Sequence, residues 1–375
     1  MAQAYTPGLQ VRERTTYRTS RLLPIPGEVL VKLGDVLGAE DVVARTQQPG
    51  TVTPVNLANV LGVPPAEVPR VLLKKGGERV EAGEALARTD GIFGLFKSTY
   101  HAPVSGTIEA VSNVTGQLIL RGEPILVEVK AFTSGEVVEI VGEEGCVMQS
   151  TATFIQGIFG IGGETYGTIR VVAKGPDEDL TPGHITPDMR GQIVIGGGRM
   201  HGETVEKAIE CGVSALVAGG IDDHDLKQIL GYDLGVAITG TEQLGITLII
   251  TEGFGDIAMA NRTFSLFQER AGAAAAVNGA TQIRAGVLRP EIVIPWHDGK
   301  PANDTAARVG GGALEVGAKV RIIRDPYFGV LAEVAAMPAE PEVLGSGSKA
   351  RIVQLQTAGG DVVTVPRANV EILSE

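Results

Sequence analysis

Cysteine is nearly absent from this chain of 375 residues, which contains only Cys146 and Cys211. The two lie far apart in the sequence, and no Cys-x-x-Cys pair occurs. Cysteine-ligated iron–sulfur clusters and structural zinc sites are therefore excluded. We accordingly predict no metal site and no cofactor, and such scarce cysteine is typical of a protein in a reducing cytoplasm.

The chain also lacks long apolar runs and an apolar N-terminus. Its longest apolar runs, such as 246–250, are far shorter than the ~20 residues that span a bilayer. Residues 1–21 are polar, rich in arginine and threonine, and contain no apolar segment of the signal-peptide type. We therefore expect a soluble, cytoplasmic protein that makes no membrane contact.

A surplus of positive charge is missing as well. The formal net charge is −12, which disfavours RNA or DNA as the main partner because these polyanions select a basic face. One local basic patch is still compatible with this charge. Aromatic residues make up only 4% of the chain, whereas it has 51 glycines. This composition indicates a turn-rich β protein, and the length predicts two to four domains.

Residues 1–24 read as an N-terminal arm, since arginines and threonines alternate there without an apolar pattern. Two interpretations stay open for this arm. It is either a mobile segment that pairs with a neighbouring part of the protein, or a segment that binds a partner in an assembly.

Residues 25–173 contain an internal repeat. The segment 32–46 aligns with 75–89, with Lys, Gly, Ala, Ala, Arg and Thr at equivalent positions. In both copies a Gly followed by Asp or Glu predicts a tight turn between short strands. A third related segment begins at 134–138. Two interleaved β modules, built from strands distant in the sequence, fit this pattern better than a solenoid of many units.

Within this region, 94–122 alternates apolar and polar residues around Pro103, Gly106 and Gly116. The sequence Ala-Pro-Val-Ser-Gly-Thr-Ile at 102–108 resembles the barrel-sandwich hybrid fold. This fold occurs in biotinyl and lipoyl carriers and in the N-terminal region of the RnfC family. The resemblance implies a small β module with these three residues at turns. We expect its other half to come from residues 25–52 or 134–170.

The chemistry of those families is not carried over with the fold. Lys97 lies near the place of a carrier lysine, but its neighbours Phe96 and Ser98 match no carrier motif. We therefore predict an exposed, unmodified Lys97. The resemblance to the RnfC family, over 71–129, would require cysteine-ligated clusters and a nucleotide-binding turn, and this sequence supports neither. The glycine-rich stretch 154–164 lacks the Gly-Lys-Ser/Thr of a phosphate loop, which favours a buried β segment.

Residues 191–295 change to the alternation of an α/β domain, after a linker over 174–188. Short apolar strands alternate with helical segments that have one apolar face, which predicts a parallel sheet in three layers. The expected strands are 192–195, 214–218, 235–239, 246–251 and 291–294, and the expected helices are 203–211, 226–230 and 258–270.

Ligands of parallel sheets bind beyond the carboxyl ends of the strands, where this chain is glycine-rich and polar. Two arginines and two glycine amides there could meet a small anionic ligand, and four carboxylates flank them. A turn is the competing interpretation for the glycines, and a helix N-cap the competing one for the two aspartates. The candidate ligand-binding residues are Gly197, Gly198, Arg199, Asp222, Asp223, Glu242, Glu252 and Arg284.

Residues 313–375 follow a second linker over 296–312 and form the last predicted domain. The stretch 316–330 has a Gly-x-x-Val-Arg-Ile sequence, a proline–aromatic turn and a glycine. It resembles the KOW motif of NusG-like elongation factors, which implies a small SH3-like barrel that binds RNA or protein. Basic and acidic residues balance here, so we favour protein contact through Arg324, Tyr327 and Phe328.

Over its whole length the chain resembles a bacterial family that combines these modules, and this resemblance implies no reaction. No catalytic residue is predicted. Our first hypothesis is a non-catalytic multidomain scaffold or adaptor that acts by protein–protein contact in a homo-oligomeric assembly. The alternatives are a small-molecule- or phosphate-binding α/β domain with β accessory modules, and a transcription- or ribosome-associated factor that acts through the KOW-like barrel.

Overall fold

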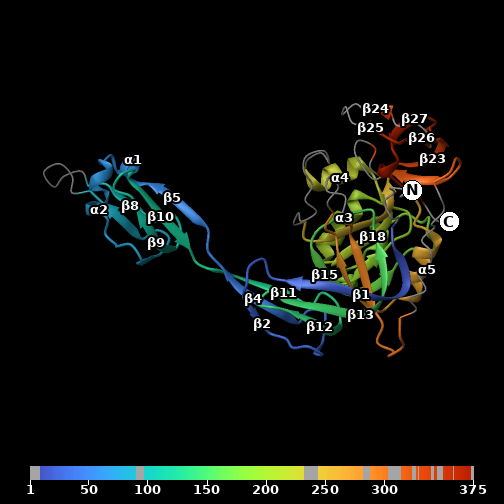
Figure 1. Ribbon diagram of the computed structural model, residues 1–375, viewed down its shortest axis with the longest axis horizontal. Helices are drawn as coiled ribbons and strands as arrows, with labels where there is room; N and C mark the ends of the chain where they lie inside the picture. The colour runs from blue at the N-terminus through green and yellow to red at the C-terminus, as the bar shows by residue number, and fades with distance from the viewer. Residues whose placement is uncertain are drawn as a thin grey trace.

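The computed structural model shows an elongated, mostly β protein with three β-rich parts and a C-terminal sheet (Figure 1). A small distal module lies at one end, a middle module follows, and the large body lies at the other end. The structure describes residues 9–89, 97–231, 244–281, 288–302, 314–322, 327, 329–338, 342–343, 349–357 and 359–372.

Two long antiparallel strands join the body to the middle module. Strand β1 (Val11–Leu22) pairs along its length with β13 (Gly145–Gln156). One half of β13 also pairs with β12 (Gly135–Val141) of the middle module, and the other half pairs with β21 (Glu291–Pro295) of the body. From Val11 onward, the segment expected as an N-terminal arm is thus a strand of the large sheet, while residues 1–8 lie outside the described residues. Exposed and less exposed side chains alternate from Thr15 to Leu22, as they do on a strand with one covered face.

The body is built on one large mixed sheet of 12 strands, of which β14–β21, β1 and part of β13 lie in the body. Its centre is parallel, with β15 (Glu164–Val171), β16 (Ile193–Ile195), β18 (Ala215–Ile221) and β19 (Thr247–Phe254) side by side. The remaining body strands are β14 (Phe159–Ile161), β17 (Arg199–Met200) and β20 (Ala274–Asn278). Antiparallel β14 and β20 flank the parallel centre, so the expected all-parallel sheet is corrected to a mixed one.

Helices cover both faces of the parallel centre, as the three-layer prediction requires. The helices α3 (Gly202–Cys211) and α4 (Asp223–Leu230) pack on Val194 and Leu216. On the opposite face, α5 (Asn261–Glu269) packs on Ile195 and Val217. Successive strand residues thus face different helices, which explains why these strands are apolar throughout. The segment between β15 and β16, expected as a linker, contributes Leu180, Ile185 and Met189 to the first of these cores.

The middle and distal modules have the same internal pairing, so the repeat in the sequence is a repeat in structure. An offset of 43 residues relates the turn glycines Gly34 and Gly77, which both have positive φ (85° and 87°). It also relates β3 (Val36–Leu37) to β6 (Arg79–Val80), and β4 (Val42–Gln48) to β7 (Ala85–Arg88). An offset of 29 residues relates β12 to β9 (Gly106–Val111), because Gly135 pairs with Leu37 as Gly106 pairs with Val80.

The distal module is inserted into a hairpin of the middle module. In the distal module, β7 pairs with β8 (Thr99–His101), so that Arg88 lies opposite Thr99. In the middle module the equivalent strands are β4 and β11 (Ile125–Lys130), with Arg45 opposite Glu128. Residues 49–124 are an insertion between these two strands, and they contain the distal module. The modules are thus nested, which corrects the expected interleaving.

The distal module completes itself from nearby strands. It contains β5 (Val52–Asn56), α1 (Leu57–Leu61), α2 (Val68–Val71) and β6–β10, the last being Gln117–Gly122. Strand β10 pairs with β5, and β9 pairs with β6, which corrects the expectation that the other half comes from 25–52 or 134–170, since only Val52 falls in either range. Gly116 lies at the β9–β10 turn with φ 69°, and Pro103 lies at a bend. Gly106 instead starts β9, and Lys97 is exposed as predicted.

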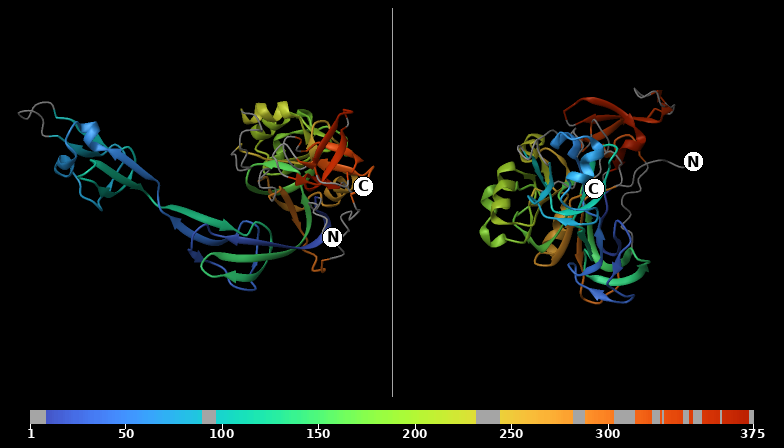
Figure 2. Two further views of the ribbon diagram at one scale, coloured as in Figure 1. Left: turned by 45° about the horizontal axis from the view of Figure 1, so that its top comes forward. Right: turned by 90° about the vertical axis from the view of Figure 1, so that its left-hand side faces the viewer.

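A two-stranded ribbon connects the two modules, as the left-hand view of Figure 2 shows. The β4–β11 ladder stops at Gln48 and Ile125, and the β5–β10 ladder resumes at Val52 and Arg121. Pro49 and Pro124 lie in this interruption and have no N–H to donate. The backbones cross closely at Gly50, where a Cβ would lie 2.1 Å from Gly122 O. Within the interruption, Gly122 N donates to Thr51 O at 2.9 Å and joins the two strands.

The C-terminal part is a five-stranded antiparallel sheet with its own core, described for residues 314–322, 327, 329–338, 342–343, 349–357 and 359–372. The strands of the sheet are β22 (Lys319–Ile322), β23 (Leu331–Ala336), β26 (Ile352–Thr357), β27 (Val362–Pro366) and β28 (Val370–Ile372), with β24 (Glu342–Val343) and β25 (Lys349–Ala350) in a separate short hairpin. Two hairpins, β22–β23 and β26–β27, build the sheet, and β28 pairs with β22.

The strand pairing displaces the expected limit between the regions 25–173 and 191–295. Strands β13, β14 and β15 lie within 25–173, yet they pair with body strands from 191–295. The expected limit between these two regions therefore runs through one sheet.

Candidate functional site

At the carboxyl ends of the parallel strands, where the ligand crevice was predicted, the described glycines bond within the chain. The N–H groups of Gly197 and Gly198 donate to the carbonyl of Glu178, at 3.2 and 2.7 Å. A Cβ on Gly197 would lie 2.1 Å from Gly175 O. The glycines are thus required by close packing of the 175–179 segment, and their amides are not available for an anion.

Arg199 follows these glycines and is occupied by two carboxylates. Its Nη2 lies 2.8 Å from Asp225 Oδ2, and its Nη1 lies 3.0 Å from Asp256 Oδ1. These contacts, with Asp225 first, raise the pKa of Arg199. Its charge is neutralised inside the protein, so it does not present a free guanidinium to a phosphate.

The two adjacent aspartates serve the start of helix α4. Asp222 is the N-cap, and its carboxylate accepts a hydrogen bond of 2.8 Å from His224 N. Burial, followed by the nearby Asp222 charge, raises the pKa of Asp223. This outcome matches the N-cap interpretation of the sequence. Glu242 and Arg284 lie outside the described residues.

Glu252 belongs to a buried ionic network that joins the body to the C-terminal sheet. Arg321 on β22 contacts Glu252 Oε2 at 2.9 Å and Glu371 Oε1 at 2.8 Å. Glu371 also accepts from Arg289 at 2.7 Å. The side chains of Arg321 and Glu371 are both 1% exposed, so water does not screen the pairs. Two cations and two anions balance here, which makes the network a structural junction.

The glycines at this junction allow the C-terminal sheet to approach. A Cβ on Gly253 would lie 2.7 Å from Gly329 O, and one on Gly329 would lie 2.7 Å from the Phe254 ring. The carboxyl end of β19, where ligands are usual in parallel sheets, is therefore in contact with the C-terminal part of the same chain.

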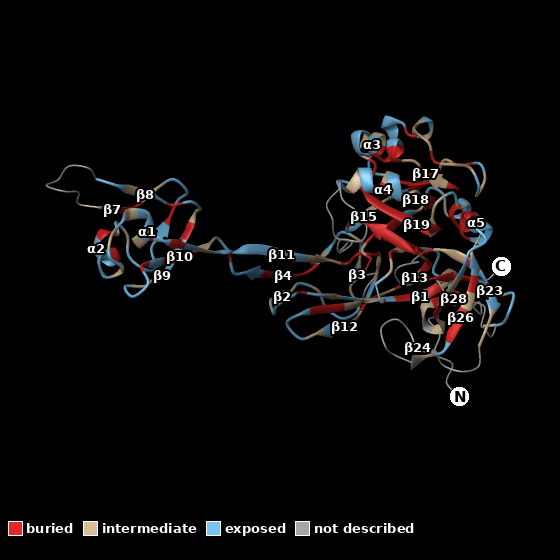
Figure 3. Ribbon diagram, turned by 90° about the horizontal axis from the view of Figure 1, so that it is seen from above, coloured by how far each residue is buried: buried red, intermediate tan, exposed pale blue. Residues whose placement is uncertain are grey.

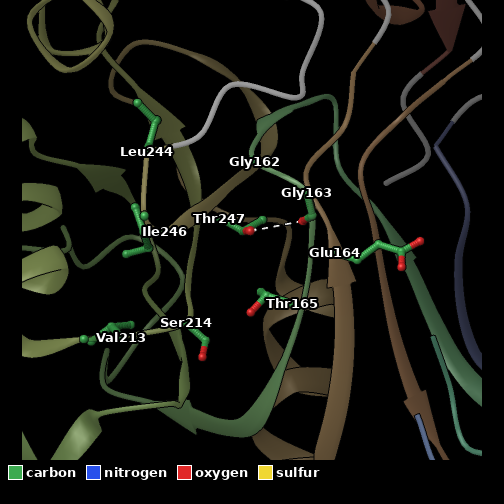
Figure 4. Close-up of a pocket in the computed structure, with 11 residues that line it drawn as sticks. Gly162, Gly163, Glu164, Thr165, Val213, Ser214, Leu244, Ile246 and Thr247 are labelled. Atoms are coloured by element: carbon green, nitrogen blue, oxygen red, sulfur yellow. Dashed lines mark hydrogen bonds between the residues drawn. The ribbon is translucent and has the colours of Figure 1, made fainter. Parts of the chain in front are cut away.

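A cavity of about 630 Å³ lies instead at the amino ends of the parallel strands (Figure 4). It is lined by residues that precede or begin β15, β18 and β19, with Thr165 and Ser214 as its hydroxyl-bearing side chains besides Thr247. Thr247 Oγ1 already donates to Gly163 O at 3.1 Å. Glu164 turns away in Figure 4 and pairs with Arg21 at 2.6 Å. The described lining therefore offers hydroxyl and backbone groups without an available charge.

The expected partner site on the C-terminal sheet is described only in part. Tyr327 is 38% exposed, whereas Arg324 and Phe328 lie outside the described residues. Sequence reasoning missed Arg321 and Glu371 because both lie in strand patterns where a charged residue reads as solvent-facing. One signal was present, since Arg321 interrupts the apolar run from Val320 to Ile322.

No known protein family, curated protein or solved structure matches this chain. Within the described ranges, no group of three or more His, Cys, Asp or Glu side chains is arranged to hold a metal ion. The same part of the chain contains no helix long and apolar enough to cross a membrane.

Proposed function

We propose that this protein is a non-catalytic scaffold or adaptor of the cytoplasm that acts through protein–protein contacts in an assembly of its own copies. The observation that carries the proposal is the nested architecture. A complete module is held away from the body at the end of a two-stranded ribbon (Figures 1 and 2). Such a module gains no stability from the body, so its position serves reach and contact.

The distribution of polar groups supports contact over catalysis. Catalytic sites need titratable groups that face a reacting molecule, with pKa values matched to the reaction. In the described part of the body, Arg199 and Glu252 are instead bound by carboxylates and arginines of the chain. Large exposed apolar side chains lie on the ribbon and the middle module, at Leu33, Val36 and Leu126.

The fold assignments drawn from resemblance enter this proposal as well. The two repeated modules are assigned to the barrel-sandwich hybrid type, and their identical pairing supports a common fold. The C-terminal sheet is assigned as a KOW-type, SH3-like barrel. Its strand order β27-β26-β23-β22-β28 supports this, because the last strand returns beside the first. Its near-neutral charge favours a protein partner for Tyr327 over RNA.

Native mass spectrometry of the endogenous full-length protein tests the proposal. We expect an oligomer of this chain or a stoichiometric complex with another protein, without a bound small molecule. A monomer that carries no protein partner would contradict it. A stoichiometric nucleotide or metabolite would instead favour a ligand-binding function.

That alternative is a ligand site in the cavity at the amino ends of β15, β18 and β19. Its volume of about 630 Å³ is that of a small-molecule site, and its hydroxyls suit an uncharged polar ligand. A thermal-shift screen of sugars, nucleosides and polyols would detect it. The substitution Ser214→Val should abolish any shift found, and Ser112→Val, in the distant distal module, should leave it unchanged.

A further inference from the structure

Strand β11 is the edge of a small sheet of the middle module, whose order is β11-β4-β2 (β2, Glu28–Val29). Among the described residues, no strand pairs with its other side. Ile125 is 53% exposed and Leu126 is 57% exposed, and Figure 3 shows the strand in the exposed colour. An open edge with exposed apolar side chains is a template for pairing with another strand.

The hydrogen bonds identify which backbone groups are open. Leu30 N donates to Val43 O at 2.9 Å, so Val43 faces β2 and its neighbour Ala44 faces β11. By the register of β4 with β11, Val127 and Val129 then bond to β4. Leu126 and Glu128 therefore turn their N–H and C=O groups to the open side. The open stretch ends at Lys130, whose carbonyl accepts from Arg21 Nε at 2.6 Å.

The repeat supplies an internal comparison. The strand equivalent to β11 in the distal module is β8, and helix α1 lies against it. The positions equivalent to Leu126 and Val127 are Lys97 and Ser98, which are exposed and polar. Another edge strand, β5, carries Pro54, a residue that protects edges. Only one of the two copies of this hairpin therefore combines an open edge with apolar residues.

We propose that β11 pairs antiparallel with β11 of a second copy of this chain, around a two-fold axis at Val127. This inference deepens the proposed function and rests on it. Leu126 then exchanges backbone hydrogen bonds with Glu128 of the second copy, which uses every open group of the stretch. Val127 faces its own counterpart, and Ile125 faces Val129. The register shifted to centre on Glu128 would oppose two carboxylates and is disfavoured.

Charge sets the salt dependence of this contact. The middle module, residues 23–50 and 123–149, has 10 acidic and 3 basic side chains. Two copies therefore repel one another, while the paired strands attract through apolar contact and backbone hydrogen bonds. Because salt screens the repulsion, association should strengthen as ionic strength rises. One strand pair is smaller than a standard interface, so the dimer should also depend on protein concentration.

Sedimentation equilibrium of the full-length chain, over a concentration series at low and high salt, tests the proposal. We expect a monomer–dimer equilibrium that shifts toward dimer at high salt. The double substitution Leu126→Lys and Val127→Ser installs the residues of the distal copy, so the hairpin should still fold. It should weaken the dimer at least about tenfold. Leu33→Lys, at another exposed apolar residue of the middle module, is the matched control: it adds the same charge as Leu126→Lys and should not weaken the dimer.

Two further variants test the geometry. Val127→Cys, with Cys211→Ser to remove the partly exposed thiol, should form a disulfide-linked dimer, because facing residues at such a position lie ~4.5 Å apart. Glu128→Pro removes an N–H that faces the open side and makes no bond to β4. It should therefore also weaken association.

Three results would overturn the inference. A dimer unaffected by all β11 variants would place self-association on another surface and leave the proposed function intact. A wild-type monomer that holds a stoichiometric foreign protein would exclude self-association, and it would also leave the proposed function intact. A wild-type monomer without any partner would remove both the inference and the proposed function.

Discussion

Arg321 is the residue on which the junction between body and C-terminal sheet depends most. Its side chain is 1% exposed and contacts Glu252 and Glu371. Removing one partner of a buried network leaves uncompensated charge behind, which costs about 3–5 kcal/mol. Arg321→Met should therefore lower the free energy of unfolding by about that amount, measured by urea denaturation. It should also release the C-terminal sheet to limited proteolysis.

The exposed pair of Arg45 and Glu28 provides the control for that experiment. Both side chains are about half-exposed or more, at 48% and 61%. Exposed pairs contribute roughly 0–1 kcal/mol, so Arg45→Met should change stability little. Equal effects of the two substitutions would show that the Arg321 network is not a stabilising junction.

Glu291 makes stability depend on pH with the opposite sign to an ordinary carboxylate. Burial raises its pKa, while a hydrogen bond of 2.9 Å from the buried Tyr17 hydroxyl opposes that rise. The folded protein thus binds this proton more tightly than the unfolded chain. The resulting stability is complete below the ordinary pKa of 4.5 and is lost as pH rises through the folded-state pKa. Glu291→Gln removes the charge and retains an acceptor for Tyr17.

We expect Glu291→Gln to stabilise the protein more at pH 8 than at pH 4.5, as measured by urea unfolding at both values. Tyr17→Phe should instead destabilise the protein, since it removes the hydroxyl that donates to the charged carboxylate of Glu291. Its destabilisation should be larger at pH 8. Effects of either substitution that are the same at both pH values would contradict this assignment.

At the scale of elements, the crossing of the ribbon depends on Gly50. A Cβ there would lie 2.1 Å from Gly122 O and 2.4 Å from Glu123 O, and backbone atoms cannot yield as a flexible side chain can. Gly50→Ala should therefore force the two strands apart. Hydrogen exchange of the β5 and β10 amides should accelerate next to the crossing. Gly76→Ala is the control, because a Cβ there meets nothing within 4 Å, and it should leave exchange unchanged.

Local patterns predicted individual elements well and their connections poorly. The apolar runs and C-terminal glycines around α3 and β18 sufficed to place both, as did the turn glycines Gly34 and Gly77 for the repeat. The nesting of the modules was not predictable in this way. It depends on β4 pairing with β11, about 80 residues later, and alternation alone does not specify a partner strand.

The candidate site shows the same division. The role of Asp222 as the N-cap of α4 followed from local sequence, because an aspartate before a helix accepts a hydrogen bond from a backbone N–H of the first turn. Local sequence did not indicate that Asp225 and Asp256 pair with Arg199, or that residues 175–179 pack against Gly197 and Gly198. Those contacts join residues that are distant in the sequence, so the polar residues at the strand ends do not reveal them.

At the scale of the whole molecule, nesting predicts that the distal module can be removed or isolated. Gln48 and Ile125 lie opposite one another at the end of the β4–β11 ladder, so a two-residue Asn-Gly turn can replace residues 49–124. The middle module would then keep its β4–β11 ladder, which matches the β7–β8 ladder of the distal module. The distal module, residues 51–122, has its own core and adjacent ends at Val52 and Arg121.

We expect the shortened chain to unfold within a few degrees of the main transition of the wild type, as measured by differential scanning calorimetry. The isolated distal module should show a separate cooperative transition. Retention of the β11 edge means that the shortened chain should also still self-associate, because the pairing surface at Leu126 remains. An insoluble shortened chain beside a soluble distal module would mean that the middle module folds only on its insert. In that case the two modules would be one cooperative unit of folding.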